Sequence, residues 1–147
     1  MRGRWLWALA LLVWAQGCSD ALKPEAGPTE QHPVLSEPVE VRVLYGDDEL
    51  VPETDIDIGF VSVLYDYRCP EDATCGWPGS ATVGLRITLG SGPGAVFLLN
   101  TGVEPRSLAL GDYLISVLGL SPERHTGDTI PTRKYQVELR VENIRAH

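Results

Sequence analysis

Residues 135–142 read Tyr-Gln-Val-Glu-Leu-Arg-Val-Glu, an unbroken alternation of apolar and polar side chains. Successive side chains of a strand point to opposite faces, so this period of two predicts a half-buried β-strand. Further strand candidates, alternating or continuously apolar, occupy residues 39–45, 56–65, 81–89, 95–99, 106–110 and 113–120. Turn-forming residues at 46–48 and 90–94 separate some of these segments.

About seven or eight short strands separated by Gly, Pro and Asp turns predict an all-β chain folded as an antiparallel β-sandwich. The stretch Leu110-Gly111-Asp112-Tyr113 resembles the corner that precedes a late strand in immunoglobulin-like domains. In those domains a tyrosine hydroxyl bonds back to the chain. The resemblance implies an immunoglobulin-like sandwich, and a plainly buried Tyr113 is the alternative.

The alternation changes phase inside residues 56–65. The apolar residues of 56–60 share one parity, whereas Val61, Val63 and Tyr65 share the other. One extra residue in a strand produces such a change, so we predict a β-bulge near residues 59–61.

The first residues have the three parts of an export signal: basic Arg2 and Arg4, a short apolar core at 5–15, and small residues before Cys18. The stretch Ala15-Gln16-Gly17-Cys18 resembles the bacterial lipobox. This resemblance implies cleavage after Gly17 and acyl chains on Cys18, and two or more chains anchor a protein firmly to a membrane. An ordinary secretory signal cut near Gly17, with Cys18 left as a free thiol, is the alternative.

The resemblance also implies a location in the bacterial cell envelope. Ser19 after the cysteine implies, by similarity to enterobacterial sorting, delivery to the outer membrane, facing the periplasm or the cell surface. The expected organisation is then a cleaved signal peptide with its helix at 1–17, a flexible and disordered Pro-rich tether at 18–37, and a β-sandwich domain at 38–147.

The charge balance argues against nucleic acid as a partner. Loss of Arg2 and Arg4 with the signal leaves 10 basic residues of the original 12 against 20 acidic ones, so the net charge moves from −8 to −10. A field of that sign repels phosphate backbones and anionic lipid surfaces.

A segment with two cysteines, residues 66–79, reads Asp-Tyr-Arg-Cys-Pro-Glu-Asp-Ala-Thr-Cys-Gly-Trp-Pro-Gly. In an oxidising compartment Cys69 and Cys75 most simply form a disulfide. Asp66 and Arg68 are candidates to pair with each other or to cap the turn, and Trp77 is a candidate to cover the disulfide. A thiolate metal site is the alternative, for which the domain offers only His125 and His147 as further ligands.

The same segment resembles a group of small, mostly uncharacterised bacterial lipoproteins and secreted proteins. Their pattern is Asp-Ser-Arg-Cys-Pro, a few residues, then Cys-x-Trp-x-Gly and an alternating strand. The matching residues are Asp66, Arg68, Cys69, Pro70, Cys75, Trp77 and Gly79. Tyr67 stands in place of the usual Ser, and Ser80 stands where a polar amide or acidic residue is common. The resemblance implies a β-sandwich in the envelope and brings no established activity.

A calcium site among the acidic residues of 47–57 is a further alternative. The pair Asp55-x-Asp57 is similar to only part of an EF-hand loop, since Gly59 is one position early and the flanking helices are missing. The alternating apolar residues at 56–60 favour a strand with solvated carboxylates instead.

We find no catalytic motif in the sequence, and we expect no cofactor and no resident metal. The leading hypothesis is a non-enzymatic, lipid-anchored binding or structural module whose partner is another envelope protein. Its candidate contact loop contains Asp66, Arg68 and Trp77. The alternatives are a small-ligand or metal-ion binding module and an inhibitor of an extracytoplasmic enzyme.

Overall fold

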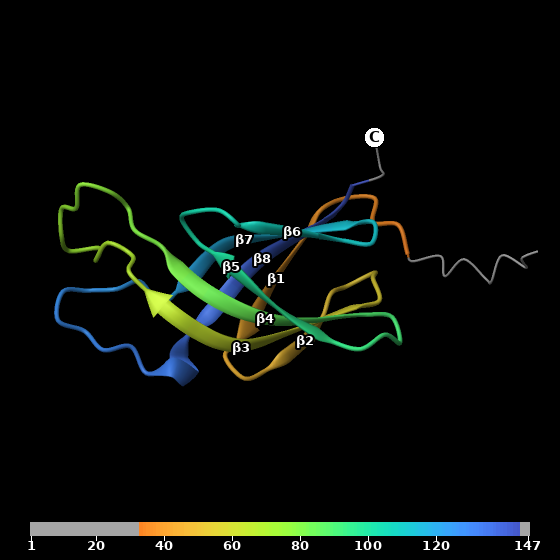
Figure 1. Cartoon of the computed structure of the whole chain (residues 1–147), viewed down its shortest axis with the longest axis horizontal. Coiled ribbons are helices and arrows are strands. Elements are labelled where there is room, and N and C mark those ends of the chain that lie inside the picture. Colours follow the sequence, from red (N-terminus) through yellow and green to blue (C-terminus); the bar gives the residue numbers. More distant parts are fainter. Residues whose placement is uncertain (1–32, 145–147) are drawn as a thin grey trace, which may run out of the picture. The chain divides into compact units, whose positions relative to one another are not determined.

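The computed structural model describes residues 33–144, which form two packed antiparallel sheets (Figure 1). The predicted all-β sandwich is confirmed. The expected signal peptide, the lipidation site at Cys18 and the tether up to residue 32 lie outside the described residues. Within residues 33–144 there is no helix with the length and apolar character needed to cross a membrane.

Eight strands make up the two sheets: β1 (Val39–Leu44), β2 (Asp48–Leu50), β3 (Ile56–Asp66), β4 (Ala81–Leu89), β5 (Ala95–Asn100), β6 (Ser107–Leu110), β7 (Tyr113–Ser121) and β8 (Gln136–Asn143). One sheet has the order β1-β8-β7-β6 and the other has the order β2-β3-β4-β5. A short 3₁₀ turn, Thr132–Lys134, precedes β8. The expected segments all form strands, and β2 adds a short one that begins at Asp48, the last residue of the predicted turn.

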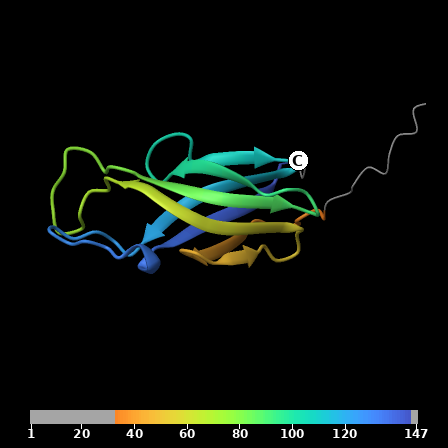
Figure 2. The same cartoon turned by 60° about the horizontal axis from the view of Figure 1, so that its bottom comes forward.

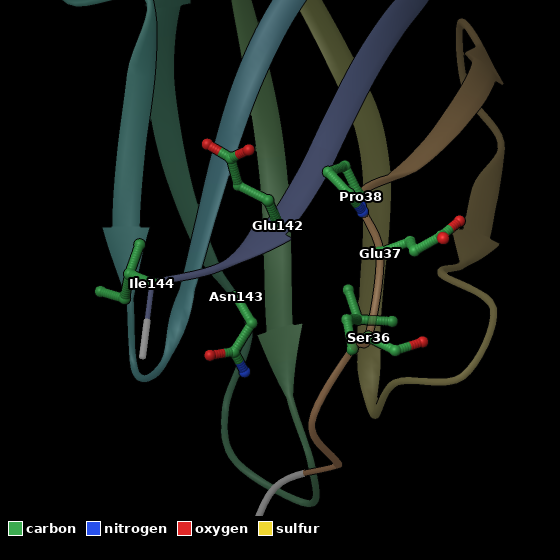
Figure 3. Close-up of a pocket in the computed structure, with 7 residues that line it drawn as sticks. Ser36, Glu37, Pro38, Glu142, Asn143 and Ile144 are labelled. Carbon is green, nitrogen blue, oxygen red and sulfur yellow. The ribbon is translucent and has the colours of Figure 1, made fainter. Parts of the chain in front are cut away.

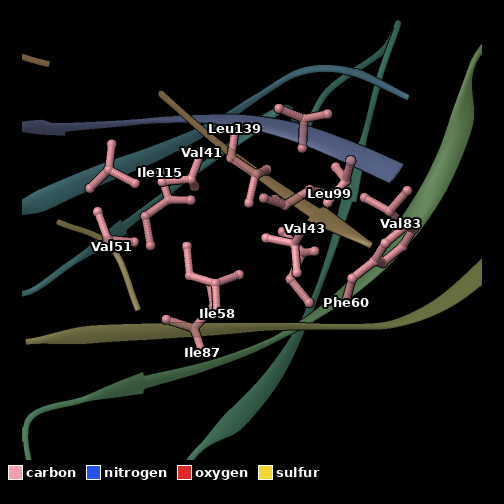
Figure 4. Packing of buried hydrophobic residues seen from close by; sticks show 14 of the residues in the cluster. Val41, Val43, Val51, Ile58, Phe60, Val83, Ile87, Leu99, Ile115 and Leu139 are labelled. Carbon is pink, nitrogen blue, oxygen red and sulfur yellow. The ribbon is translucent and has the colours of Figure 1, made fainter. Parts of the chain in front are cut away.

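The core lies between the two sheets and is built from the alternating positions (Figure 4). In β8 the residues Val137, Leu139 and Val141 are buried, while the residues between them are at least partly exposed. Phe60 and Leu85 are paired neighbours on the inner face of the facing sheet. Burial of the apolar face of each strand is the main contribution to the stability of such a sandwich.

The phase change in β3 is a bulge, as predicted. The register with β4 shifts between Phe60 and Ser62, which makes Val61 the extra residue. A second register shift lies between Val63 and Tyr65. Because of it, the Tyr65 side chain lies on the outer face of the sheet, where it is exposed. The interpretation that Tyr65 shares the inward parity of Val63 is therefore wrong, because counting along the sequence does not reveal a second extra residue.

The strand order corrects the expectation of an immunoglobulin-like arrangement. In an immunoglobulin constant domain the first, second, fifth and fourth strands share one sheet. Here the second to fifth strands pair in chain order, and the first strand pairs with the last. Alternation identifies which side chains are buried, but it does not specify which strands are neighbours.

The packed domain begins before residue 38. Leu35 is 2% exposed and belongs to the core, although the sequence assigns it to the tether. The buried Tyr113 donates its hydroxyl to the Pro33 carbonyl, a partner far from the one that the immunoglobulin-type corner implies. This bond and the burial of Leu35 fix the entering segment to the sandwich.

Candidate functional site

The long connections at one end of the sandwich form the most elaborate surface of the domain. The connection between β3 and β4 and the connection between β7 and β8 extend from the same end and lie side by side (Figures 1 and 2). We call this surface the loop end and define it by residues 67–80, 101–106 and 122–135. Strands β3 and β7 end there, and β4 and β8 begin there.

The disulfide predicted between Cys69 and Cys75 is present and closes residues 69–75 into a small ring. Two backbone bonds join the chain on either side of this ring: the Cys69 N–H donates to the Pro78 carbonyl at 2.8 Å, and the Tyr67 N–H donates to the Ser80 carbonyl at 2.8 Å. The loop therefore continues the β3–β4 pairing outward and ends in a covalently closed tip.

Below the loop, Arg68 and Asp66 form an ion pair that is removed from solvent. Each side chain is only 10% exposed. Arg68 donates from Nε to Asp66 Oδ1 at 2.9 Å and from Nη2 to Asp66 Oδ2 at 2.8 Å, a bidentate geometry. The Tyr135 hydroxyl also donates to Asp66 Oδ2, at 3.0 Å. The predicted pairing of Asp66 with Arg68 is confirmed.

The remaining donors of Arg68 reach the end of β7. Nη1 donates to the Leu120 carbonyl, and Nη2 donates to the Pro122 carbonyl at 3.0 Å. One guanidinium thus joins the end of β3 to the end of β7, two strands from opposite sheets. A planar fork with five donors suits this position, whereas the ammonium of a lysine is a compact point charge with three donors and no bidentate geometry.

The pKa values of the group follow from these contacts. Burial raises the pKa of Asp66, but the hydrogen bonds and charge of Arg68 outweigh it and hold that pKa below its usual value of 3.8. Burial raises the pKa of Tyr135, and its bond to the Asp66 carboxylate raises it further. Asp66 is therefore ionised and Tyr135 is neutral at pH 7.

The two long connections are also bonded directly to each other. Arg124 Nη1 donates to the Arg68 carbonyl at 2.9 Å, and the Glu71 N–H donates to the Arg124 carbonyl at 2.8 Å. The Thr126 N–H donates to Asp72 Oδ1 at 2.8 Å, and this bond lowers the pKa of Asp72. These contacts hold the disulfide-closed tip against the β7–β8 connection.

Glycine at position 79 lets two backbone segments of the loop approach each other closely, which a larger amino acid at this position would prevent. Its φ is +73°, and a Cβ atom there would lie 2.0 Å from the Tyr67 carbonyl oxygen. The third connection approaches in the same region, because a Cβ on Gly102 would lie 2.2 Å from the Gly79 carbonyl oxygen. Glycine at 79 is thus required both by backbone conformation and by space.

Aromatic side chains are exposed at and beside the loop end. Trp77 is 60% exposed. Tyr65 and Tyr67 are also more than half exposed and stack on each other, with ring centroids 5.9 Å apart and an interplanar angle of 11°. Large exposed aromatic side chains on a well-ordered scaffold are typical of contact surfaces.

The surface of residues 33–144 includes open hollows, and the lining residues define three of them. One of about 500 Å³ is formed mainly by the β7–β8 connection and includes Glu71, His125 and Lys134. Another of about 340 Å³ lies beside it over β8 and includes Arg42 and Glu123. The third, of about 290 Å³, is at the opposite end, between the entering residues 35–38 and residues 142–144 (Figure 3).

No cluster of three or more His, Cys, Asp or Glu residues that could hold a metal occurs among residues 33–144. Cys69 and Cys75 are joined to each other, and His125 is near Glu71 at 3.7 Å between Nε2 and Oε2. His147 lies outside the described residues. Of the acidic residues at 47–57, Asp48 pairs with Arg86 across the sheet at 2.5 Å.

The structure separates the three residues of the predicted contact loop into two roles. The side chains of Asp66 and Arg68 are each only 10% exposed and are bonded within the fold, whereas Trp77 is exposed. Sequence reasoning missed Tyr135 and Arg124, which complete the support of the loop. Their contacts are 69 and 56 positions away in the sequence, so no local signal identifies them.

Comparison with protein-family models, with curated proteins and with solved structures finds no match to this chain.

Proposed function

We propose that the chain is a lipid-anchored protein of the bacterial cell envelope, without catalytic activity, whose loop end binds another envelope component. The observation that carries the proposal is the exposure of Trp77, Tyr65 and Tyr67 on a scaffold held by a disulfide and a buried ion pair. Tryptophan and tyrosine are enriched among the residues that dominate binding energies. The lipobox-like stretch ending at Cys18 and the motif at 66–79 support the envelope location.

Preorganisation is the physical reason why this surface suits binding better than an ordinary loop. Ordering a loop on association costs free energy, and a loop that is already ordered avoids that cost. The ring at 69–75 is covalently closed, and the contacts of Arg68 and Arg124 fix its base. A partner would therefore meet aromatic side chains whose backbone is already in place.

The position of the entering segment is consistent with this role. Residues 33–38 lie at the end of the sandwich opposite to the loop end (Figure 2). The described chain therefore enters the domain at the end opposite to the loop end.

Lipidation is tested by expressing the full chain in a bacterium and feeding an alkyne-labelled fatty acid. We expect label on the wild-type chain and its recovery in the membrane fraction. The variant C18A should lose both the label and the membrane association. A labelled C18A chain, or an unlabelled wild-type chain in the soluble fraction, contradicts the anchoring part of the proposal.

Binding is tested in the same cells with a photoreactive amino acid at position 77. The matched control carries the same residue at Leu50, which is equally exposed at 60% but lies on β2. We expect a defined adduct with one envelope component from position 77 and none from position 50. Identical adduct patterns, or no adduct at 77, contradict the binding part.

A further inference from the structure

Strand β5 is an open sheet edge without the usual protection. It is the last strand in the order β2-β3-β4-β5 of the described residues (Figure 1). Its sequence, Ala-Val-Phe-Leu-Leu-Asn, contains no charged residue and no proline. Natural proteins usually protect such edges with charges, prolines, bulges or very short strands, because an open edge pairs readily with another strand.

The other three edges formed by the described residues carry such protection. Strand β2 has three residues, two of them acidic, and β6 has four residues. Strand β1 is as long as β5 but carries Glu40 and Arg42, each in an ion pair with β8. Among the edge strands of residues 33–144, β5 is the one that is both long and uncharged.

The backbone of β5 shows which groups face the open side. The Thr101 N–H donates to the Ala81 carbonyl at 3.0 Å, so the odd-numbered residues of β5 bond to β4. The even-numbered residues then direct their N–H and C=O groups away from β4. The Asn100 N–H confirms this orientation, since it turns to the Pro105 carbonyl at 2.8 Å.

Two residues therefore present four backbone groups at the open edge, the N–H and C=O of Val96 and of Leu98. Their side chains lie on the outer face of the sheet and are 58% and 51% exposed. The open backbone and the exposed apolar side chains thus belong to the same two residues, as expected for a strand that accepts another strand.

We propose that the edge of β5 pairs with β5 of a second copy of this chain, antiparallel about a two-fold axis beside Phe97. In this register Val96 faces Leu98 of the other copy, and all four open groups of each copy find a partner. No charge is placed opposite a like charge, because the strand has none. The exposed side chains of Val96 and Leu98 cover one another, and the two four-stranded sheets become one continuous sheet.

The test measures the mass of the full chain in detergent by sedimentation over a range of concentrations. The wild type should be a dimer. The variant V96P removes one outward N–H from each copy and no bond to β4, and should weaken dimerisation about thirtyfold. The variant L98K places a charge on the edge of each copy and should weaken it at least about tenfold.

The control L50K puts the same charge on the opposite edge of the same sheet and should leave the dimer intact. Circular dichroism verifies that each variant is folded. A monomeric wild type at the highest concentration reached overturns the proposal. So does an L98K chain that dimerises like the wild type, since that result assigns the association to the lipid anchors or to another surface.

The register is tested on natively folded chains with a short thiol-reactive cross-linker. A mixture of V96C chains and L98C chains should give more cross-linked dimer than either variant alone, relative to the chain without a new cysteine. Equal yields from the mixture and from L98C alone contradict the register, and no cross-linked dimer in any mixture contradicts the pairing itself.

Discussion

The substitution R68M should destabilise the domain severely, although it replaces the charge with an apolar side chain of comparable length. The residue is 9% exposed, and its guanidinium is bonded to Asp66 and to the carbonyls of Leu120 and Pro122. After substitution the Asp66 carboxylate keeps only the Tyr135 hydroxyl and a weak 3.3 Å bond from the backbone N–H of residue 68.

The magnitude follows from the groups that lose a partner. A buried charge deprived of its counter-charge costs about 3–5 kcal/mol. The two carbonyls add about 1 kcal/mol each if water does not reach them. We therefore expect the free energy of unfolding to fall by at least about 3 kcal/mol, a large part of the stability of a small domain.

A matched substitution, R42M, provides the control. Arg42 also makes two bonds to one carboxylate, that of Glu138, but its side chain is 67% exposed. Exposed pairs contribute only about 0–1 kcal/mol, so R42M should change stability little. The two substitutions differ in burial and in the two carbonyl contacts that Arg68 makes.

Urea unfolding monitored by far-ultraviolet circular dichroism measures both variants, with the disulfide intact. The double variant D66N/R68M should recover part of the loss, because it removes the unpaired charge. A cost for R68M within about 1 kcal/mol of that for R42M would refute the reasoning, as would a D66N/R68M chain less stable than R68M.

Three further predictions concern the same end of the molecule. The folded pKa of Asp66 is below its unfolded value of 3.8. The stability that Asp66 contributes should therefore be fully present above about pH 4 and decline as the pH falls through the folded pKa. Urea midpoints measured against pH should show this decline, and the D66N variant should show a smaller one. Reduction of the disulfide should lower the free energy of unfolding by about 2 kcal/mol in parallel denaturation curves, since the closed loop is short; an unchanged midpoint would mean that hydrogen bonds alone order the loop. The substitution G79A should lower the melting temperature more than G127A. Both glycines have positive φ, but a Cβ at position 79 would lie 2.0 Å from a backbone oxygen, whereas nothing lies within 4 Å of a Cβ at position 127. Equal shifts in melting temperature would show that the close approach to the Tyr67 carbonyl relaxes freely.

The strands and the first bulge could be predicted from the sequence because both depend on local alternation. Residues 81–89 and 135–142 alternate without interruption, and their buried sets follow the pattern. Strand β2 could not be predicted, because its three residues are all exposed and carry no periodic signal. Strand β2 forms because it pairs with β3, and this pairing cannot be inferred from the sequence of residues 48–50 alone.

The candidate site was predictable only in part, for a related reason. The proximity of Cys69 to Cys75 and of Asp66 to Arg68 is local, and both pairings could be inferred. Whether Arg68 is buried depends on Leu120 and Pro122, which are 52 and 54 positions away. The sequence places Leu35 in the tether because the surrounding residues are mostly prolines and polar residues, which give no periodic signal for a single core residue.

The attachment of residues 33–38 to the end opposite to the loop determines how the domain would bear mechanical tension. A pull on residue 33 along the long axis acts along β1, whose six residues all pair with β8 (Figure 2). These pairs are loaded together in shear instead of one after another as in unzipping. A partner held at the loop end would supply the opposing force, so tension between the two ends of the domain would load these six pairs in parallel.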